Sequence, residues 1–519
     1  MKKVLLIIID ALATRVVEPA LLAGRLPNLS RLVDAGLMRA ECTAIFPSIT
    51  PAATCSLATG CYPREHGIAG AYWYDRDLDE VAYFGTDIWA IVNEGAGHYL
   101  MDFQYKLNCD RLAVPTIFER VEKHGHLRDA VINLLWFRGT VDHEISWPLL
   151  FKLIPGDYEK KMPGPHLMFM GDFVNTLLPR GERIQARGGI SRRFGFHDET
   201  TADYLLQLAE LDSLPEFTLA YFPNNDFDSH ERGPLDAEVD LEAIDQHLGH
   251  LFEIHGGLSK MLEEFAIVIT GDHSQSDLSS ADEAAVDLNE VLKDYQLAKA
   301  GAAWQSGDDV MVCPNMRAAQ IYFQIDSWED RQPIIERLLE EEGVDQILWC
   351  DSDEGLEAKD VQFHVVTQER GRLQFSLANH ENGLGKDDYG THWTWAGDLA
   401  ALDATVDSSG RIRWGDYPNS FERIAASFFH QSGSIWVTAK LGREFCLPET
   451  SCYEGGSHGS LHALDSTSPL IAAGLPPSIT LPEKMRSVDV TPLCMMILDL
   501  EPPRELGASH IQELSPARS

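Results

Sequence analysis

Residues 265–273 read Phe-Ala-Ile-Val-Ile-Thr-Gly-Asp-His, an apolar run that ends in an aspartate and a histidine. A continuous apolar run of this length is typical of a strand buried on both faces, as in a parallel sheet. Asp272 and His273 then emerge at the carboxyl end of the strand, where open α/β sheets bind their ligands. The run therefore predicts an α/β fold with polar residues at one edge of a parallel sheet.

Two further apolar runs end in polar residues in the same way. Val4–Ile9 is followed by Asp10, and Phe217–Phe222 is followed by a segment that contains Asp226 and His230. The carboxyl ends of parallel strands meet along one sheet edge, so we expect these side chains to lie close together. Asp226 and His230 are four residues apart and would share one face of a helix. The neighbouring Asn, Gly and Pro residues, however, favour a loop.

Residues 46–60 read Phe-Pro-Ser-Ile-Thr-Pro-Ala-Ala-Thr-Cys-Ser-Leu-Ala-Thr-Gly, which predicts a loop that leads into a helix. Backbone N–H groups at a helix start favour an anion, and the Thr50 hydroxyl can face such an anion. Taken alone, Thr50 predicts a helix cap, Asp10 a loop acid, and His458 a surface histidine in its Gly/Ser-rich loop. These residues indicate a site because they occur together in one chain.

Aspartate oxygens and histidine nitrogens are the ligands that zinc and similar divalent ions take. Two such ions about 3.5–4 Å apart hold both the attacking and the leaving oxygen of a phosphoryl transfer. They also lower the pKa of a bound hydroxyl, which makes a threonine a usable nucleophile. The combination of acids, histidines and Thr50 therefore predicts metal-dependent phosphoryl chemistry.

The composition is that of a soluble globular protein, with 44% hydrophobic and 24% charged residues in a chain of 519. The 42 basic residues are outnumbered by 80 acidic ones, which gives a net charge of −38. Such a surface repels nucleic acid and anionic membranes, so we expect neither as a partner. A small phosphorylated substrate remains compatible, because metal cations dominate the local charge of a pocket. The composition gives no prediction of the oligomeric state.

The nine cysteines include no CxxC pair, so neither a zinc knuckle nor a disulfide framework is predicted. We expect them to be mostly reduced, with Cys446 and Cys452 as the one pair that a short loop can join, and we predict a cytoplasmic location. The apolar run after Met1 is six residues long and closed by Asp10, too short for a signal peptide. No stretch has the length of a membrane span.

Taken in order, the motifs resemble the alkaline phosphatase superfamily, in particular its type I phosphodiesterase / nucleotide pyrophosphatase branch. The segments that carry the resemblance are Ile8-Ile9-Asp10, residues 46–50 with 58–60, residues 62–68 (Tyr-Pro-Arg-Glu-His-Gly-Ile), Asp226-x-x-x-His230-x-x-Gly233-Pro234, Thr270–His273 and Ser457-His458-Gly459. The resemblance implies an alkaline-phosphatase-like three-layer sandwich with a central, mostly parallel sheet and cap insertions.

The resemblance also implies the roles of the site residues. One ion would be held by Asp226, His230 and His458, and the other by Asp10, Asp272, His273 and the Thr50 oxygen. Thr50 would attack phosphorus and form a phospho-threonine that water then hydrolyses. The expected cofactors are two divalent metal ions, with zinc preferred and manganese or iron as alternatives.

The sequence departs from the family pattern near the nucleophile. The family commonly has an asparagine that contacts a phosphate oxygen where this chain has Ala71, and an Asn-His pair where it has Ala53 and Thr54. A sulfatase would require a cysteine at position 50 and an arginine at position 54, so Thr50 and Thr54 argue against that activity. The aromatic run 72–74 (Tyr-Trp-Tyr) either stacks on a planar substrate group or packs inside the protein.

We predict a hydrolase that cleaves a phosphodiester or pyrophosphate bond. The alternatives on the same site are a phosphomonoesterase, a phosphonate hydrolase and a metal-dependent phosphomutase, and a non-catalytic metal-binding homologue is the alternative from another class. The predicted organisation is a core of residues 1–135, 201–290 and 431–519, interrupted by a cap-like insertion (136–200) and a second αβ insertion (291–430).

Overall fold

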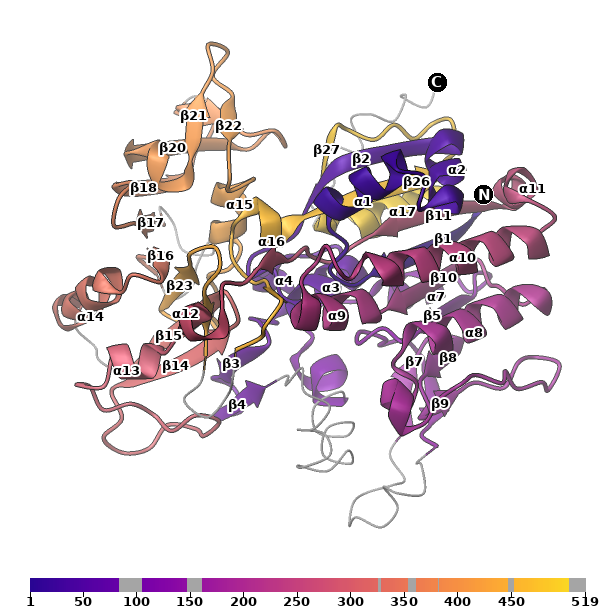
Figure 1. The fold of residues 1–519 in the computed structure, drawn as a ribbon, viewed down its shortest axis with the longest axis horizontal. Coiled ribbons are helices and arrows are strands. Elements are labelled where there is room, and N and C mark those ends of the chain that lie inside the picture. The colour runs from indigo at the N-terminus through magenta and orange to yellow at the C-terminus, as the bar shows by residue number, and fades with distance from the viewer. Residues whose placement is uncertain are drawn as a thin grey trace.

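The computed structural model describes all residues except 84–104, 147–160, 325–327, 353–360, 381, 447–451 and 504–519. Within the described residues the chain forms a main sheet of nine strands and a second sheet of eight. Figure 1 shows the two sheets beside each other, with α3, α4, α9 and α16 in the region between them. The N-terminus lies at the end of the main sheet that faces away from the second sheet (Figure 1).

The main sheet is mostly parallel. Its order is β27 (Lys484–Arg486), β2 (Gly36–Thr43), β26 (Thr467–Ala473), β11 (Phe265–Thr270), β1 (Lys3–Ile9), β10 (Phe217–Phe222), β5 (Asp129–Ile132), β8 (Leu167–Met170) and β9 (Val174–Asn175). The strands from β11 to β8 pair in parallel, whereas β26 and β9 pair antiparallel with their neighbours.

Both faces of this sheet are covered. Val4, Leu6 and Ile8 of β1 pack into one hydrophobic cluster, whereas the alternate residues Leu5, Ile7 and Ile9 pack into another. Alternation of this kind follows from the two-residue period of a strand, and a sheet buried on both sides needs a helical layer on each. The predicted three-layer α/β sandwich is therefore confirmed.

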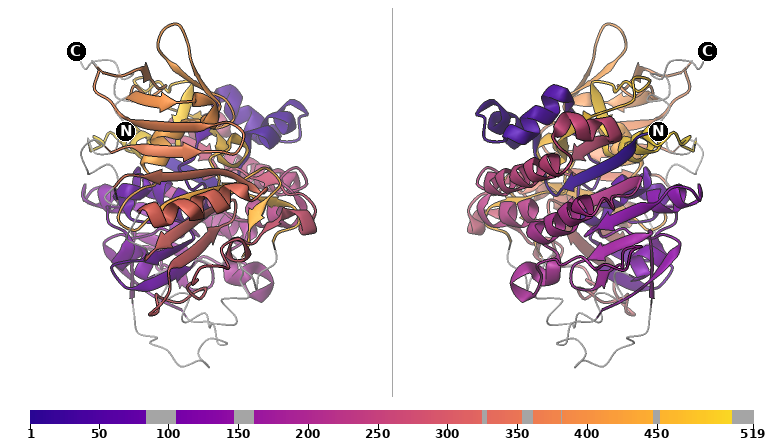
Figure 2. Two further views of the ribbon diagram at one scale, coloured as in Figure 1. Left: turned by 90° about the vertical axis from the view of Figure 1, so that its left-hand side faces the viewer. Right: turned by 90° about the vertical axis from the view of Figure 1, so that its right-hand side faces the viewer.

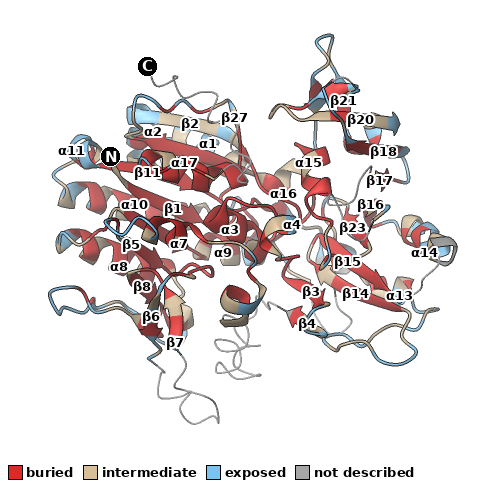
Figure 3. Cartoon of the chain, turned by 180° about the vertical axis from the view of Figure 1, so that it is seen from behind, coloured by how far each residue is buried: buried red, intermediate tan, exposed pale blue. Residues whose placement is uncertain are grey.

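The two helical layers come from different parts of the chain. One cluster takes buried residues from α3 (Thr50–Thr59), α7 (Ile117–Glu122) and α17 (Val490–Ile497). The other takes them from α1 (Thr14–Leu22), α2 (Pro27–Ala35), α8 (Asp198–Glu210), α10 (Glu238–Ile254) and α11 (Leu258–Glu264). Figure 3 shows the strands and the inner faces of these helices as buried, with exposed residues on the outer surfaces.

The second sheet has helices on both faces. Its order is β14 (Val310–Asn315), β15 (Ala318–Phe323), β23 (Ile435–Ala439), β16 (Val344–Cys350), β17 (Phe363–Val366), β18 (Arg372–Leu377), β20 (His392–Gly397) and β19 (Gly385–Lys386). Helices α13 (Leu288–Val291) and α14 (Trp328–Glu340) pack on one face and α15 (Ser420–Ala425) on the other. The left view of Figure 2 faces this sheet, with α14 lying across it.

Short elements connect and flank the sheets. The two-stranded pairs are β3 (Tyr72–Asp75) with β4 (Glu80–Tyr83), β6 (Val141–Glu144) with β7 (Lys161–Gly164), β12 (Ser276–Asp277) with β25 (Gly456–Ser457), β13 (Ala285–Val286) with β24 (Glu444–Phe445), and β21 (Ala404–Val406) with β22 (Ile412–Trp414). The remaining α-helices are α4 (Pro63–His66), α9 (Asn224–Arg232), α12 (Ala281–Ala284) and α16 (Ala463–Ser466). Helical turns of other types lie at Leu107–Arg111, Ile190–Gly195, Leu399–Leu402 and Ser487–Asp489.

Three strand assignments differ from the sequence interpretation. Residues 431–519 were predicted to belong to the core, but β23 within them pairs with β15 and β16 of the second sheet. Within the expected cap-like insertion 136–200, β8 and β9 extend the main sheet beyond β5. An apolar run shows that a strand is buried but not which sheet buries it. The division of the chain into five segments stays a prediction.

The segment between Glu238 and Glu264 forms two helices. Helix α10 ends at Ile254 and α11 begins at Leu258, with Gly256 and Gly257 at φ values of 78° and 109° between them. Left-handed backbone of this kind ends a helix, and glycine adopts it without the penalty of a Cβ atom. Among the described residues, the helices lack the combination of length and apolar character that crossing a membrane requires.

Candidate metal centre

The three parallel strands β11, β1 and β10 are neighbours and end at the same edge of the main sheet. Asp10 directly follows β1, Asp272 and His273 follow β11, and β10 leads through Pro223 into α9. Helix α9 carries Asp226 and His230 on one face, so the expectation of a loop at this position is wrong. The strand ends place the predicted residues together at the side of the sheet that faces the second sheet (Figure 1).

Thr50 is the first residue of α3. Ile49 before it has extended backbone, Pro51 occupies the second helical position where its missing N–H costs nothing, and Gly60 closes the helix at a φ of 73°. The Thr50 Oγ1 atom lies 3.0 Å from Nε2 of His273. The start of α3 therefore points the threonine hydroxyl into the cluster of acids and histidines.

His458 arrives from the far end of the chain. Strand β25 pairs with β12, which begins three residues after His273, and Ser48 forms a β-bridge with Gly459. Gly459 has a φ of 118°, and a Cβ atom there would lie 2.5 Å from the Asn315 carbonyl oxygen. A glycine is thus required for the loop to pass this close to β14.

The six predicted acid and histidine ligands are at most 4% exposed. Nε2 of His273 lies 3.4 Å from Asp10 Oδ1 and 3.5 Å from Asp272 Oδ2. Asp226 offers one oxygen to each of two histidines, at 3.5 Å from His230 Nε2 and 3.6 Å from His458 Nε2. The rings of His273 and His458 stack with centroids 3.7 Å apart, so the two groups of side chains adjoin.

All three histidines present the same nitrogen to the centre of the site. The Nδ1 atoms of His230, His458 and His273 lie 2.8, 2.8 and 3.1 Å from the backbone carbonyls of Gly456, Ser48 and Ser274. A carbonyl only accepts, so each Nδ1 carries the proton and each Nε2 keeps a free lone pair. This is the orientation that a metal ligand needs, with the second nitrogen fixed by a backbone acceptor.

The carboxylates are oriented by neighbours that the sequence did not reveal as site residues. Tyr221 donates its hydroxyl to Asp10 Oδ2, the Asn225 amide donates to the Asp10 carbonyl at 2.7 Å, and the Gln275 amide donates to Asp226 Oδ1. Tyr221 is the penultimate residue of the apolar strand β10, and its hydroxyl, close to the strand end, was the one local indication that it contributes to the site. Such contacts fix the geometry of metal ligands.

The electrostatics of the site favour the binding of cations. Burial, with the charges of Asp226 and Asp272, raises the pKa of Asp10 well above its ordinary value. Burial, with the neighbouring His273, lowers the pKa of His458 well below its ordinary value. Asp10 Oδ1, Asp272 Oδ2, His230 Nε2 and His458 Nε2 are buried without a hydrogen-bond partner. Three carboxylates and three imidazoles, with these four buried atoms available to a ligand, fit two divalent ions.

The structure brings the acids and histidines into two overlapping groups. One contains Asp10, Asp272 and His273, and the other contains Asp226, His273 and His458. Within each group the candidate ligand atoms lie within 4.8 Å of one another. His230 joins the second group through Asp226, and His273 belongs to both. The proximity of all seven predicted residues is thus observed, and their assignment to individual ions stays a prediction.

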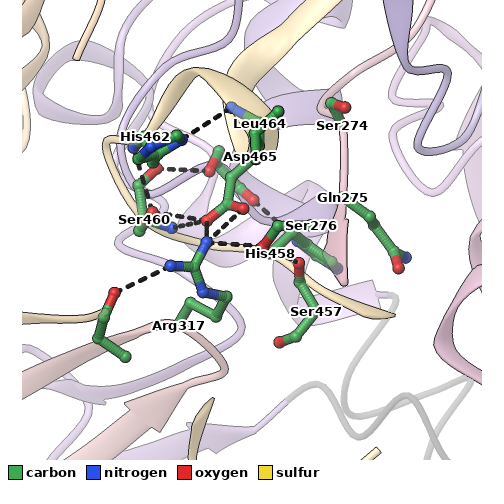
Figure 4. Close-up of polar contacts among 12 residues, drawn as sticks. Ser274, Gln275, Ser276, Arg317, Ser457, His458, Ser460, His462, Leu464 and Asp465 are labelled. Atoms are coloured by element: carbon green, nitrogen blue, oxygen red, sulfur yellow. Dashed lines mark hydrogen bonds and ion pairs between the residues drawn. The ribbon is translucent and has the colours of Figure 1, made fainter. Parts of the chain in front are cut away.

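A buried ion pair supports the loop that carries His458 (Figure 4). Arg317 donates through one guanidinium nitrogen to both carboxylate oxygens of Asp465 and, at 2.8 Å, to the Ser276 hydroxyl. The Arg317 backbone N–H also donates to the His458 carbonyl at 2.8 Å. Asp465 in turn accepts from the Ser460 N–H and hydroxyl. Because Arg317 directly precedes β15, this pair ties the site loop to the second sheet.

An aromatic ring and a disulfide bond lie beside the second group. Tyr453 stacks on His230 with ring centroids 3.9 Å apart. The preceding residue, Cys452, is bonded to Cys446, which confirms the pair that the sequence suggested. The other seven cysteines, which all lie within the described residues, form no disulfide bond. Disulfides persist in oxidising compartments, and the cytoplasmic location stays a prediction.

The aromatic run beyond Ala71 packs inside the protein. Tyr72, Trp73 and Tyr74 are 2%, 1% and 8% exposed and join the core cluster of the main sheet, so stacking on a substrate is not their role. Asn315 accepts from the Ala71 and Tyr72 N–H groups and donates to the Tyr72 and Cys313 carbonyls. Its amide is fully used and does not replace the family's phosphate-binding asparagine.

This chain is similar to one known family of proteins. The family model for type I phosphodiesterase / nucleotide pyrophosphatase matches residues 4–460. Two solved structures of murine ectonucleotide pyrophosphatase / phosphodiesterase 5 have a TM-score of 0.57 and 13% identity, with 99% of this chain and 100% of the other covered. One of them is an inactive threonine-to-alanine variant in complex with AMP. At this identity the two structures show a shared fold.

Among curated protein sequences, no relative matches this chain. The family model nevertheless spans most of its length and includes every residue of the candidate site. The protein is therefore a hydrolase that belongs to the type I phosphodiesterase / nucleotide pyrophosphatase family of the alkaline phosphatase superfamily.

Proposed function

We propose that this chain is a two-metal enzyme that cleaves a phosphodiester or pyrophosphate bond, with Thr50 as the nucleophile. The observation that carries the proposal is the Thr50 hydroxyl, held 3.0 Å from His273 among buried ligand atoms that lack partners. In this proposal Asp226, His230 and His458 hold one ion, and Asp10, Asp272, His273 and the Thr50 oxygen hold the other. The expected ions are zinc.

When bound, the two ions would supply Lewis acidity that lowers the pKa of the Thr50 hydroxyl and offsets the charge of the phosphate. Thr50 Oγ1 then forms the bond to phosphorus while the leaving alcohol or phosphate departs. Water attacks the resulting phospho-threonine, which releases the phosphoryl product and restores the hydroxyl. The Thr50 N–H belongs to the first turn of α3, where backbone donors lack intrahelical acceptors and can bind a phosphate oxygen.

The substrate class rests on the surroundings of the site. The AMP bound by the murine neighbour supports a nucleotide-like substrate for this chain also. The net charge of −38 argues against long polyanions, so we propose a small substrate rather than nucleic acid. Ala71 lacks the amide with which the family commonly contacts a phosphate oxygen, which keeps the phosphonate and monoester activities as competing candidates.

The test is the substitution Thr50→Ala in the zinc-loaded protein. Hydrolysis of an aryl phosphodiester should fall by about 10³-fold or more, because the variant has no oxygen to attack phosphorus. Thr50→Ser should keep measurable turnover, and acid-quenched wild type should carry a phosphate on Thr50 by mass spectrometry. Undiminished hydrolysis by Thr50→Ala would show that the nucleophile lies elsewhere.

Thr59→Ala is the matched control. Thr59 is a buried threonine at the other end of α3, and its hydroxyl donates to the Cys55 carbonyl at 2.7 Å. Its loss should leave kcat/KM within a few-fold of wild type. Rates on an aryl phosphodiester, an aryl monoester and an aryl phosphonate then decide between the competing activities, since the attack on phosphorus is the same and the leaving group differs.

A further inference from the structure

A second group of acids with a histidine lies at the opposite edge of the main sheet. Glu122 is the last residue of α7, Asp129 is the first of β5, and His166 directly precedes β8. Strands β5 and β8 pair in parallel with Ala130 opposite Leu167, so Asp129 and His166 are neighbours at the amino ends of their strands. We call these three residues the amino-edge cluster.

Contacts within the amino-edge cluster are close. The His166 N–H and Nδ1 lie 2.9 and 2.7 Å from Asp129 Oδ1. Nδ1 is also 3.9 Å from Glu122 Oε1, and the three candidate ligand atoms lie within 4.8 Å of one another. Glu122 is held in place through its other oxygen, which accepts from the Thr140 N–H at 2.7 Å.

Each carboxylate has one buried oxygen without a hydrogen-bond partner, Oε1 of Glu122 and Oδ2 of Asp129. The side chains of Glu122 and Asp129 are 3% and 0% exposed. Asp10 Oδ1 and Asp272 Oδ2 of the metal centre share this property. Among the described residues, the ion pairs of Glu122 and Asp129 are with His166 alone, and no lysine or arginine offsets the two charges.

Two adjacent buried carboxylates are costly without a positive charge between them. Burial, followed by the charge of Asp129, raises the pKa of Glu122 to about 7. A divalent cation removes this cost because it neutralises both charges and fills the free coordination of both oxygens. Histidine nitrogen and carboxylate oxygens suit zinc and manganese, and the His166 side chain, 30% exposed, leaves one side open to water ligands.

We propose that Glu122, Asp129 and His166 form a further divalent-cation site, separate from the catalytic centre, which takes zinc or manganese. Binding places the imidazole proton on Nε2 and turns the Nδ1 lone pair to the ion, so His166 no longer donates through Nδ1 to Asp129. The ion joins the end of α7 to the starts of β5 and β8 and stabilises this part of the sheet.

The distance along the strands separates the two sites. Asp129 is in register with Phe217, and Phe217 with Val4, whereas Asp10 lies six residues further along the β1 direction. At about 3.3 Å per residue this amounts to roughly 20 Å. An ion at the amino-edge cluster therefore has no contact with a substrate at the carboxyl edge, and its effect is on stability.

The test is the zinc content of the full-length protein after loading with Zn²⁺ alone and removal of excess ion. Wild type should hold one ion per chain more than Asp129→Asn and one more than Glu122→Gln. This difference does not depend on how many ions the catalytic centre holds, so it fails or succeeds separately from the proposed function. Equal zinc contents in wild type and both variants would overturn the site.

Thermal unfolding gives a second measurement that does not need an exact ion count. Without metal, Asp129→Asn should melt at or above the wild-type temperature, because it removes a buried charge and keeps an acceptor for the His166 N–H. With zinc, it should melt below wild type. The matched control Glu290→Gln removes an exposed carboxylate from an ion pair with Lys293 and should change neither measurement. The same order of melting temperatures with and without zinc would contradict a cation at this position.

Discussion

The carboxyl and amino ends of the parallel strands form two edges of the main sheet, which carry the same kinds of side chain in different surroundings. At the carboxyl edge, three aspartates, three histidines and Thr50 come from segments spread between residues 10 and 458. At the amino edge, Glu122, Asp129 and His166 come from one stretch of the chain. The carboxyl edge contains a hydroxyl in contact with a histidine, whereas the amino-edge cluster consists of two carboxylates and an imidazole.

The difference lies in what orients each histidine. The carboxyl-edge imidazoles donate Nδ1–H to backbone carbonyls and turn Nε2 towards the site, so their geometry is fixed before a ligand arrives. His166 instead donates Nδ1–H to Asp129 itself and must give up that bond to bind an ion. Preorganisation therefore separates a centre that can support catalysis from a site that only holds a cation.

The largest effect is expected from Asp226→Asn, because Asp226 faces both His230 and His458. Loss of its charge should reduce kcat/KM for an aryl phosphodiester by about 10³-fold or more, which corresponds to about 4 kcal/mol. Asp129→Asn is the comparison at the other edge and should stay within about threefold of wild type. Similar losses in the two variants would show that the edges are not functionally distinct.

A smaller effect, on stability, is expected from Arg317→Met. The variant leaves Asp465 buried and without its charged partner, which should lower the free energy of unfolding by about 3 kcal/mol. Urea unfolding at constant pH measures the change. The double variant Arg317→Met with Asp465→Leu should recover most of the loss, and a double variant as unstable as the single one would contradict the charge argument.

The contact between Tyr221 and Asp10 tests the preorganisation of the carboxyl edge directly. Tyr221→Phe removes the hydroxyl that donates to Asp10 Oδ2 and should weaken metal binding by about 10- to 100-fold, measured by competition with a chelator. Tyr204→Phe removes a buried hydroxyl that donates to the Gly171 carbonyl, which belongs to none of the predicted ligand residues. It should bind metal as wild type does, and equal weakening in the two variants would count against the role of Tyr221.

The smallest effect is expected at His66, a buried histidine whose Nδ1 accepts a hydrogen bond, whereas Nδ1 of each site histidine donates one. Its Nδ1 accepts from the Ile68 N–H, so its proton is on Nε2, which lies 3.2 Å from Ser56 Oγ. Burial lowers the pKa of His66 to about 3, below about 6.5 in the unfolded chain. The unfolded state therefore takes up the proton first, and the unfolding free energy falls as pH decreases from 6.5 towards 3.

His66→Gln removes this titration. Between pH 7.5 and 5.5, the unfolding free energy of wild type relative to the variant should fall by about 1 kcal/mol, measured by chemical denaturation at each pH. A constant difference over that range would show that His66 stays neutral in both states or protonates in both. The result also tests whether a buried imidazole in this protein keeps the protonation that its hydrogen-bond partners indicate.

Much of the fold was predictable, and the reason is burial. Strands β10 and β11 match their apolar runs residue for residue, because a strand covered on both faces has no polar position to interrupt it. The predicted acids and histidines were found together because parallel strands end at one edge. Their roles as ligands are implied by the family resemblance.

The remainder depends on tertiary contacts that have no local pattern. Helix α9 forms although Asn224 and Asn225 favour a turn, since its face carries Asp226 and His230 into the site. Strand β23 is apolar and could be buried in either sheet, so its sequence did not predict the strands with which it pairs. Glu122, Asp129 and His166 lie at irregular spacings, and only the pairing of β5 with β8 brings them together.

The position of β26 has a consequence for how this protein is made. Its residues 467–473 insert between β2 and β11, which are synthesised far earlier. Until they leave the ribosome, both of those strands present an edge whose hydrogen-bonding partner does not yet exist, and His458 reaches the site only shortly before. Long-range pairing of this kind folds slowly and exposes edges that aggregate. The incomplete sheet therefore presents two unpaired strand edges until residues 467–473 have emerged.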